Sequence, residues 1–297
     1  MTTNKLLTIV TPSYNRAYIL EKCYKSLKKQ TFKCFIWMII DDGSTDNTED
    51  LVNKWINENS IEIKYYKKDN GGKALALNIA LDKVKTEYFT CLDSDDWFSY
   101  NAVELAIEKL NKIRFNEKYC GLVALRTDTN NNVLGGKTIP KEVKEITIQE
   151  ISNKYRIKSE VICFYKSNII CKYRFPEIEG EKFISPAYLE QEIGKKYKYI
   201  VSQDILCYCE YLDDGLTKNK NKIIINNPKG YTLVKRQSFE LAKDFKSKSK
   251  HAVLYIAGSI LSKDKRYIKN SPNKLMTIIY TPIGLLVYFL RFKKKLK

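Results

Sequence analysis

Short apolar runs with the two-residue period of a strand alternate with helical periodicity along the first third of the chain. The expected strands are residues 7–10, 36–40, 61–66 and 88–92. The expected helices are residues 18–29, 46–57 and 101–113, with a further helix that places Leu75, Ile79 and Val84 on one face. This alternation is typical of βαβ units and predicts an α/β fold with a mainly parallel sheet flanked by helices.

The pattern changes beyond residue 120. Residues 120–137 predict a strand, an Asn-rich turn and a return, which together make a hairpin and a mixed sheet. Short strands and a helix around residues 186–197 follow. From about Tyr231 the chain is helical and basic, with the Ser/Lys-rich residues 244–251 expected as a loose connection. We therefore expect one domain over residues 1–230 and a helical extension over residues 231–297.

The C-terminal segment, residues 275–292, is almost entirely apolar and has basic residues on both sides. A membrane-spanning helix needs about 20 apolar residues, and Pro282 and Gly284 interrupt this run. A single span would also leave one basic flank and the preceding domain on the outer side. We expect an in-plane or re-entrant anchor whose basic tail contacts an anionic membrane surface. The alternative is a C-terminal helix buried in the globular domain.

The chain carries 52 Lys and Arg against 34 Asp and Glu, a formal net charge of +18. Such a charge suits nucleic acid, an anionic membrane or an anionic substrate. The basic residues are spread out, and no zinc-finger, RRM or helix-turn-helix signature occurs, so we expect no nucleic-acid partner. Residues 6–10 are too short for a signal peptide, so we expect a cytoplasmic protein, peripheral at the inner face of the membrane. The oligomeric state stays open.

The eight cysteines contain no CxxC pair, and most stand in apolar surroundings. We expect them to be small buried side chains in a reducing compartment rather than zinc ligands. The single histidine, His251, is expected to be a packing or surface residue.

Polar residues follow the first two expected strands. The proline turn TPSYNR ends the first strand and would expose Thr11 and Tyr14 to a ligand. Asp41 and Asp42 stand at the tip of the second strand, ahead of residues that can cap the next helix. Capping explains neither of these two aspartates. The carboxyl ends of parallel strands are where open α/β sheets bind ligands.

The segments NGGK and DSDD add glycines, a cation and carboxylates at the same expected edge. Lys73 at a helix N-terminus suits a phosphate group. Carboxylate oxygens prefer Mg²⁺ or Mn²⁺ to metals of soft ligands. Asp93 and Asp95 face the same way in an extended segment, so they can share one cation.

Taken in order, these four segments resemble the pattern of glycosyltransferase family 2 on a GT-A fold, over about the first hundred residues and more loosely to about residue 230. The resemblance implies a nucleotide-sugar donor, with Asp42 or Asp41 on the base. The nucleotide-binding residues it implies are Thr11, Pro12, Tyr14, Asp41, Asp42, Lys73, Asp93 and Ser94. Asp93 and Asp95 would form a DXD motif that holds Mn²⁺ or Mg²⁺ on the donor diphosphate.

The resemblance also implies inversion at the anomeric carbon by a carboxylate that deprotonates the acceptor hydroxyl. The matching region is residues 175–193, where the family's Glu-Asp pair is absent. Glu181 is the candidate base, with Glu179 as the alternative. Further on, Asp214 is expected to help close the donor site, or else residues 213–215 form a simple turn.

Two absences narrow the expected substrate. The QxxRW motif and flanking transmembrane helices of processive synthases are missing, and so is a ricin-like lectin domain. The resemblance therefore implies transfer of one sugar, from a UDP-sugar, to a lipid-linked or saccharide acceptor in bacterial surface polysaccharide synthesis. One alternative is a nucleotide-binding protein of GT-A ancestry without transfer activity. The other is a sugar nucleotidyltransferase, although TPSYNR stands where its glycine-rich phosphate loop belongs.

Overall fold

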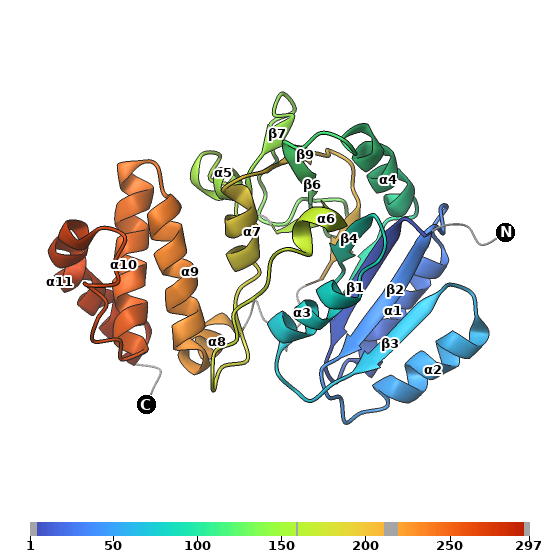
Figure 1. Ribbon diagram of the computed structural model, residues 1–297, viewed down its shortest axis with the longest axis horizontal. Helices are drawn as coiled ribbons and strands as arrows, with labels where there is room; N and C mark the ends of the chain where they lie inside the picture. Colours follow the sequence, from blue (N-terminus) through green and yellow to red (C-terminus); the bar gives the residue numbers. More distant parts are fainter. Residues whose placement is uncertain (1–4, 159, 211–218, 294–297) are drawn as a thin grey trace. The chain divides into compact units, whose positions relative to one another are not determined.

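The computed structural model describes residues 5–158, 160–210 and 219–293 (Figure 1). The chain divides into two compact units, residues 1–174 with 192–210 and residues 175–191 with 211–297. This division differs from the expected boundary at residue 230, because residues 175–191 and the chain from 211 group with the C-terminal helices.

Unit 1 contains a mixed sheet of eight strands in the order β3-β2-β1-β4-β8-β6-β9-β7. Its parallel half consists of β1 (Leu7–Ser13), β2 (Phe35–Asp41), β3 (Ile63–Lys67) and β4 (Tyr88–Cys91). β8 (Val161–Lys166) pairs antiparallel with β4 and with β6 (Tyr119–Leu125). β9 (Lys198–Val201) is parallel to β6 and antiparallel to β7 (Glu145–Ile146). A separate antiparallel pair joins β5 (Asp96–Phe98) to β10 (Cys207–Cys209).

Helices cover both faces of the parallel half. They are α1 (Ala17–Lys28), α2 (Thr48–Glu58), α3 (Lys73–Lys83) and α4 (Ala102–Lys112). The short α5 (Ile148–Asn153) and α6 (Ser167–Ile170) come later in the chain, and α6 packs on β4 and β8. Residues of α1, α2 and α4 share one apolar core with alternate residues of β1 and β2. In this core Trp37 of β2 stacks on Trp55 of α2 at 5.7 Å between ring centroids. α3 packs on β1 and β2.

The periodicity predicted the four strands and three helices to within two or three residues, and two expectations nearby failed. The expected hairpin is reduced to a single bridge between Thr127 and Val133, because β6 pairs with β8 and β9 instead. α3 buries Ala76, Leu77 and Ala80 rather than the expected stripe, because these side chains lie on the face that packs on β1 and β2.

Unit 2 is helical. It contains α8 (Lys220–Asn226), α9 (Pro228–Leu241), α10 (Phe245–Leu261) and α11 (Lys274–Arg291), while α7 (Ala187–Gly194) contains the division between the units. α10 packs against both α9 and α11. The expected loose connection at residues 244–251 is wrong: Asp244 accepts a hydrogen bond from the backbone N–H of Ser247 at 2.8 Å and starts α10. An N-cap aspartate thus outweighs the serines and lysines that suggested a loop.

α11 is one continuous helix that includes Pro282 and Gly284. Gly284 faces α10, where an added Cβ would lie 2.4 Å from a methyl carbon of Ile256. The glycine therefore permits close helix packing instead of ending the helix. The side of α11 that faces away from α10 is apolar and exposed. The alternative of a C-terminal helix buried in the globular domain is therefore wrong. The exposed apolar residues of α11 are Leu275, Ile278, Ile279, Ile283, Leu285, Leu286, Phe289 and Leu290.

Among the described residues, α11 is the one helix that is long and apolar enough to cross a membrane. Of its 18 residues, 11% are buried inside the structure.

Candidate functional site

The loop before α3 is organised by Asp42, which follows β2. One carboxylate oxygen of Asp42 accepts the backbone N–H of Gly71 at 2.9 Å and the ammonium of Lys68 at 2.6 Å. The other accepts the N–H of Gly72 at 2.7 Å. Gly72 adopts φ +93°, which favours glycine over any side chain. Asp42 therefore fixes the turn that places Lys73, the first residue of α3.

Asp41 is fully buried, and both its oxygens have partners within the fold. One oxygen accepts the N–H of Ser44 at 2.7 Å, and the other accepts the hydroxyl of Tyr65. Because Asp41 and Asp42 are both occupied by this chain's own donors, a nucleotide base reaches either one only by replacing such a partner. Their expected contact with the base stays a prediction. The N–H groups of Gly71 and Gly72 are likewise taken, which leaves Lys73 as the group of this turn that suits a phosphate.

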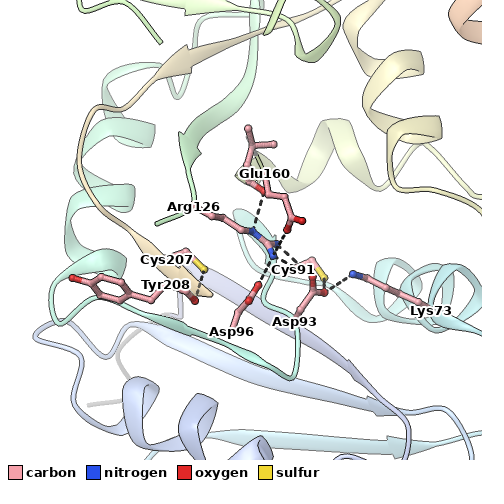
Figure 2. Close-up of polar contacts among 9 residues, drawn as sticks. Lys73, Cys91, Asp93, Asp96, Arg126, Glu160, Cys207 and Tyr208 are labelled. Carbon is pink, nitrogen blue, oxygen red and sulfur yellow. Dashed lines mark hydrogen bonds and ion pairs between the residues drawn. The ribbon is translucent and has the colours of Figure 1, made fainter. Parts of the chain in front are cut away.

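Lys73 and Asp93 connect α3 with the end of β4. The Lys73 ammonium donates a hydrogen bond to Oδ1 of Asp93, as Figure 2 shows. Burial opposes the charge on each group, but the opposite charge beside it prevails. The Asp93 carboxylate keeps the pKa of Lys73 above its ordinary value. Lys73 and Arg126 hold the pKa of Asp93 well below its usual range.

Arg126, just after β6, lies between the carboxylates (Figure 2). Its guanidinium forms ion pairs with Asp96 and, at 3.4 Å, with Asp93. Its Nε donates to the carbonyl of Val161 at 3.1 Å. Glu160 lies 3.9 Å away. Arg126 is almost buried, so it is a fixed support for the loop of residues 93–96, here called the DSDD loop.

The DSDD loop is not extended as expected: Ser94 and Asp95 lie in a turn that the backbone N–H of Asp96 closes by donating to the carbonyl of Asp93 at 3.0 Å. Asp93 and Asp95 are partly exposed, whereas Ser94 and Asp96 are buried. Burial raises the pKa of Asp96, with the nearby aspartates adding to the effect and Arg126 opposing it. Burial and the negative charge of Asp93 raise the pKa of Asp95. Apart from its own backbone N–H, the Asp95 carboxylate has no hydrogen bond or ion pair to a described residue.

These contacts decide how the loop can bind a cation. Asp93 already faces Lys73 and Arg126, so Asp95 is the carboxylate with open coordination positions. No group of three His, Cys, Asp or Glu among the described residues could hold a metal by itself. A cation at Asp95 therefore needs further oxygens from a ligand, and a diphosphate supplies them. The raised pKa of Asp95 fits this arrangement, because a cation relieves the repulsion from Asp93.

The first expected segment is only partly open. Thr11 is fully buried, and its hydroxyl accepts the indole N–H of Trp37 at 2.9 Å. The expected exposure of Thr11 is not observed, because β1 continues to Ser13 with both faces covered. Pro12 is partly exposed and Tyr14 is 47% exposed, so these two remain accessible to a ligand.

The expected base, Glu181, lies in unit 2 at the start of α9. Its two oxygens accept the backbone N–H groups of Lys229 and Gly230, each at 2.7 Å. Glu181 therefore caps a helix, a role that the sequence did not suggest. Glu179 is exposed and has no hydrogen bond or ion pair to a described residue. Both assignments stay predictions, and Asp214 lies outside the described residues.

Sequence reasoning missed Arg126 and Lys68. Arg126 ends an apolar strand, as Asp41 does, so the same signal of a charge at a strand tip was available. Lys68 directly follows β3, which is less apolar and gives a weaker signal. Both were passed over because a basic chain offers many lysines and arginines that have no such position.

The comparisons with known proteins agree with this geometry. The chain matches the Glycosyl transferase family 2 model over residues 8–171. Glycosyltransferase GlyG of Streptococcus pneumoniae serotype 4 is 26% identical over 190 residues, which cover 61% of this chain and 62% of GlyG. A Campylobacter jejuni protein named GalNAc(5)-diNAcBac-PP-undecaprenol beta-1,3-glucosyltransferase is 25% identical over 269 residues, or 89% of this chain and 78% of that protein. The chain thus spans less than two thirds of GlyG.

Two solved structures share the fold. S. aureus TarS 1–349 in complex with UDP-GlcNAc has a TM-score of 0.58 at 16% identity, over 97% of this chain and 92% of that one. The mannosyltransferase PcManGT from Pyrobaculum calidifontis, in complex with GDP-Man and Mn²⁺, has a TM-score of 0.58 at 14% identity, over 95% and 86%. The expected GT-A fold is confirmed. Because the family model covers more than half of these 297 residues, including Asp42, Lys73, the DSDD loop and Arg126, the chain belongs to Glycosyl transferase family 2.

Proposed function

We propose that this protein is an inverting glycosyltransferase that moves one sugar from a UDP-sugar to a lipid-linked saccharide acceptor in bacterial surface polysaccharide synthesis. The observation that carries the proposal is the DSDD loop. Lys73 and Arg126 hold Asp93 and Asp96 in place, while Asp95 keeps its oxygens open at the edge where parallel strands end. A nucleoside diphosphate with a divalent cation fits that combination of charges.

The relatives support the donor and acceptor classes. The similar Campylobacter protein is named for transfer of glucose to a saccharide on undecaprenol diphosphate, and the match covers most of both chains. The TarS structure holds UDP-GlcNAc, and PcManGT holds GDP-Man. A UDP-sugar and a polyprenyl-linked acceptor are therefore our first candidates.

Asp95 would hold Mn²⁺ or Mg²⁺, and Asp93 would lie beside it. The cation would neutralise the negative charge that develops on the departing nucleoside diphosphate. Lys73, fixed by Asp42 through the glycine turn and by Asp93, presents a positive charge at the same place. These positions exist before the donor binds, so little reorganisation is needed during the reaction.

The base that takes the acceptor proton is proposed from the acidic loop, residues 175–186. Both oxygens of Glu181 already accept backbone N–H groups of α9, so neither is free to meet an acceptor hydroxyl. Glu179 is the free carboxylate of the pair. We therefore place Glu179 ahead of Glu181.

One further candidate function has an observation in its favour. If the capped Glu181 was the ancestral base, the protein binds nucleotide sugars without transferring the sugar. Hydrolysis or transfer of a bound donor separates this candidate from an enzyme.

The exposed apolar side of α11 supports attachment at a membrane surface, as the lipid-linked acceptor requires. Basic residues precede and follow this helix, which suits the anionic lipids of the inner leaflet. We propose that the protein works as a peripheral protein at that face.

Calorimetric titration of UDP, GDP, CMP and TDP, with and without Mn²⁺, tests the donor site. We expect one nucleotide to bind the wild type only with metal, and Asp95→Ala to lose that binding. Asp50→Ala, which removes an exposed aspartate on α2, is the matched control and should bind as wild type does. Binding of none of the nucleotides would overturn the proposal. Binding without any turnover of the matching sugar nucleotide would favour the further candidate.

A further inference from the structure

Four basic side chains, one from each of four helices, lie close together in unit 2. This cation cluster consists of Lys220, Lys235, Lys250 and Arg291, from α8, α9, α10 and α11 respectively. The positive charges of the other three all act on Lys235. None of the four forms an ion pair with a described residue. What sets the four apart is that they lie close enough for their charges to act on one another, with Lys235 at the centre.

The contacts around Tyr231 show how the cluster is held together. The Lys235 ammonium lies 5.4 Å from the centre of the Tyr231 ring. On another side that ring packs edge-on against Phe292, which follows Arg291 directly, with 6.0 Å between centroids. The Nε of Arg291 lies 3.5 Å from the side-chain oxygen of Asn221 in α8. Helices α8, α9 and α11 therefore bring their basic side chains to one place.

A polar donor at this place also lacks a partner. The Tyr231 hydroxyl is buried near the Arg291 guanidinium but makes no hydrogen bond of normal geometry with a described residue. Such buried hydroxyls usually have a partner. Burial and the three neighbouring cations lower the pKa of Lys235 to about 8. Burial, Lys235 and Lys250 lower the pKa of His251 to about 4. An anion would relieve the repulsion and accept a hydrogen bond from the Tyr231 hydroxyl.

The ligand chemistry follows from the donors. A guanidinium, ammonium groups and a tyrosine hydroxyl together match the oxygens of a phosphate group. Arg291 is also the last residue of α11, on which Leu286 and Leu290 are exposed within the preceding turns. A membrane lipid carries a phosphate next to its hydrocarbon chains, so it can contact the cations and the exposed leucines together. A free phosphate would contact the cations alone.

We propose that the cation cluster is a binding site for the phosphate headgroup of a membrane lipid, with α11 lying in the adjoining hydrocarbon. The inference rests on the membrane association proposed above and adds recognition of one headgroup chemistry to it. Two of the cluster's residues, Lys235 and Arg291, are only partly exposed, so they suit a headgroup that enters between the helices rather than a diffuse surface charge.

The test compares vesicles of equal surface charge. Cosedimentation is measured with phosphatidylcholine vesicles that contain either phosphatidic acid or oleate, whose charge is a carboxylate. We expect the wild type to bind the phosphatidic acid vesicles more tightly. The variant Lys235→Gln/Arg291→Gln should lose that preference. Its affinity for the phosphatidic acid vesicles should fall roughly tenfold or more, because each basic residue near the surface contributes about 1 kcal/mol to binding. The control Lys265→Gln/Lys269→Gln removes two exposed charges of the same unit and should keep it.

Loss of binding through misfolding is separable, because removal of like-charge repulsion should leave the melting temperature of the Lys235→Gln/Arg291→Gln variant equal to or above that of the wild type. Equal wild-type binding to both vesicle types, or a preference that survives in this variant, would overturn the lipid-phosphate site.

If the wild type binds no vesicle, the proposed membrane association fails, and titration with short-chain phosphatidic acid decides the site by itself. Binding of that probe, lost in the same variant, would support the site. Inorganic phosphate that binds equally well would show a free-anion site instead and overturn the proposal for a lipid.

Discussion

Lys73 donates a hydrogen bond from its ammonium to Oδ1 of Asp93, and so joins the first residue of α3 to the loop after β4. Each residue is placed by separate parts of the sequence. Asp42 fixes the glycine turn before Lys73, and Arg126 holds Asp93 from the other side. The loops that follow four strands, β2, β3, β4 and β6, therefore hold the Lys73–Asp93 pair in place. Because Asp93 is engaged in this pair, Asp95 is the carboxylate that stays open.

The Lys73–Asp93 pair should make stability depend on pH. The pKa of Asp93 is lowered in the folded state, so its contribution is present above the pKa of the unfolded chain and is lost as pH falls through the lower, folded pKa. Lys73→Met should therefore destabilise the protein from about pH 5 to pH 9, with the difference from wild type shrinking below about pH 4. Thermal unfolding across pH measures this.

A matched control for this prediction is Lys67→Met, whose pair with Glu49 is exposed on both sides. Its effect should be small at every pH, because exposed ion pairs contribute little. A difference between Lys73→Met and wild type that does not change from pH 3 to pH 7, values about one unit below and three above the ordinary Asp pKa, would contradict the prediction.

Arg126→Met should destabilise the protein by about 3 to 5 kcal/mol, because it leaves the nearly buried Asp96 carboxylate without its partner. The double variant Arg126→Met/Asp96→Asn should recover much of the loss, since the uncompensated charge is gone. Arg174→Met provides the control: its ion pair with Asp82 is exposed, so about 1 kcal/mol or less is expected. Urea unfolding of the four proteins gives the values. A single variant as stable as wild type would show that Arg126 is not the support proposed here.

The sequence predicted the strands and helices of unit 1 well, because their apolar periodicity is local. It also placed the carboxylates at the correct strand ends. It did not predict the partners of those carboxylates. Asp42 meets Gly71 and Gly72 about thirty positions away, and Arg126 meets Asp96 at the same separation. Such contacts depend on how loops from different strands meet, which periodicity does not report.

Helix ends produced the other errors. Asp244 and Glu181 cap α10 and α9, yet the sequence suggested a loose connection for one and a catalytic base for the other. An acidic residue near the start of a helix looks the same in the sequence whether it caps the helix or acts as a base. Only the backbone N–H groups that it meets, such as that of Ser247, distinguish capping from catalysis.

Glutamine variants of the acidic loop separate these roles. Glu181→Gln should lower stability by about 1 kcal/mol, because an amide accepts the N–H of Lys229 or of Gly230 but not both, and carries no charge at the start of α9. Its kcat should stay within a few-fold of wild type. Glu179→Gln should keep its melting temperature and lose about 10²-fold to 10⁴-fold in kcat, with donor affinity unchanged.

Glu177→Gln, also exposed in the same loop, is the control for a lost charge and should match the wild type in kcat and stability. Loss of transfer in Glu181→Gln at unchanged melting temperature would return the base to Glu181. Normal turnover in both the 179 and 181 variants would exclude this pair.

The exposed side of α11 should determine attachment to vesicles. Substitutions are a sharper test than removal of residues 275–297, because Gly284 and Phe292 pack against the rest of unit 2 and their loss would uncover its core. Ile279→Ser/Leu286→Ser changes only side chains that are 60% and 56% exposed, so the melting temperature should stay the same. Full burial of such a side chain in the membrane stabilises binding by about 1.5 to 3 kcal/mol, so cosedimentation with anionic vesicles should fall at least tenfold.

The control Ile56→Ser changes an exposed isoleucine of α2 and should leave binding intact. If the double variant still binds as wild type does, α11 is not the attachment surface; if the wild type forms a dimer that this variant abolishes, a second copy covers that face instead.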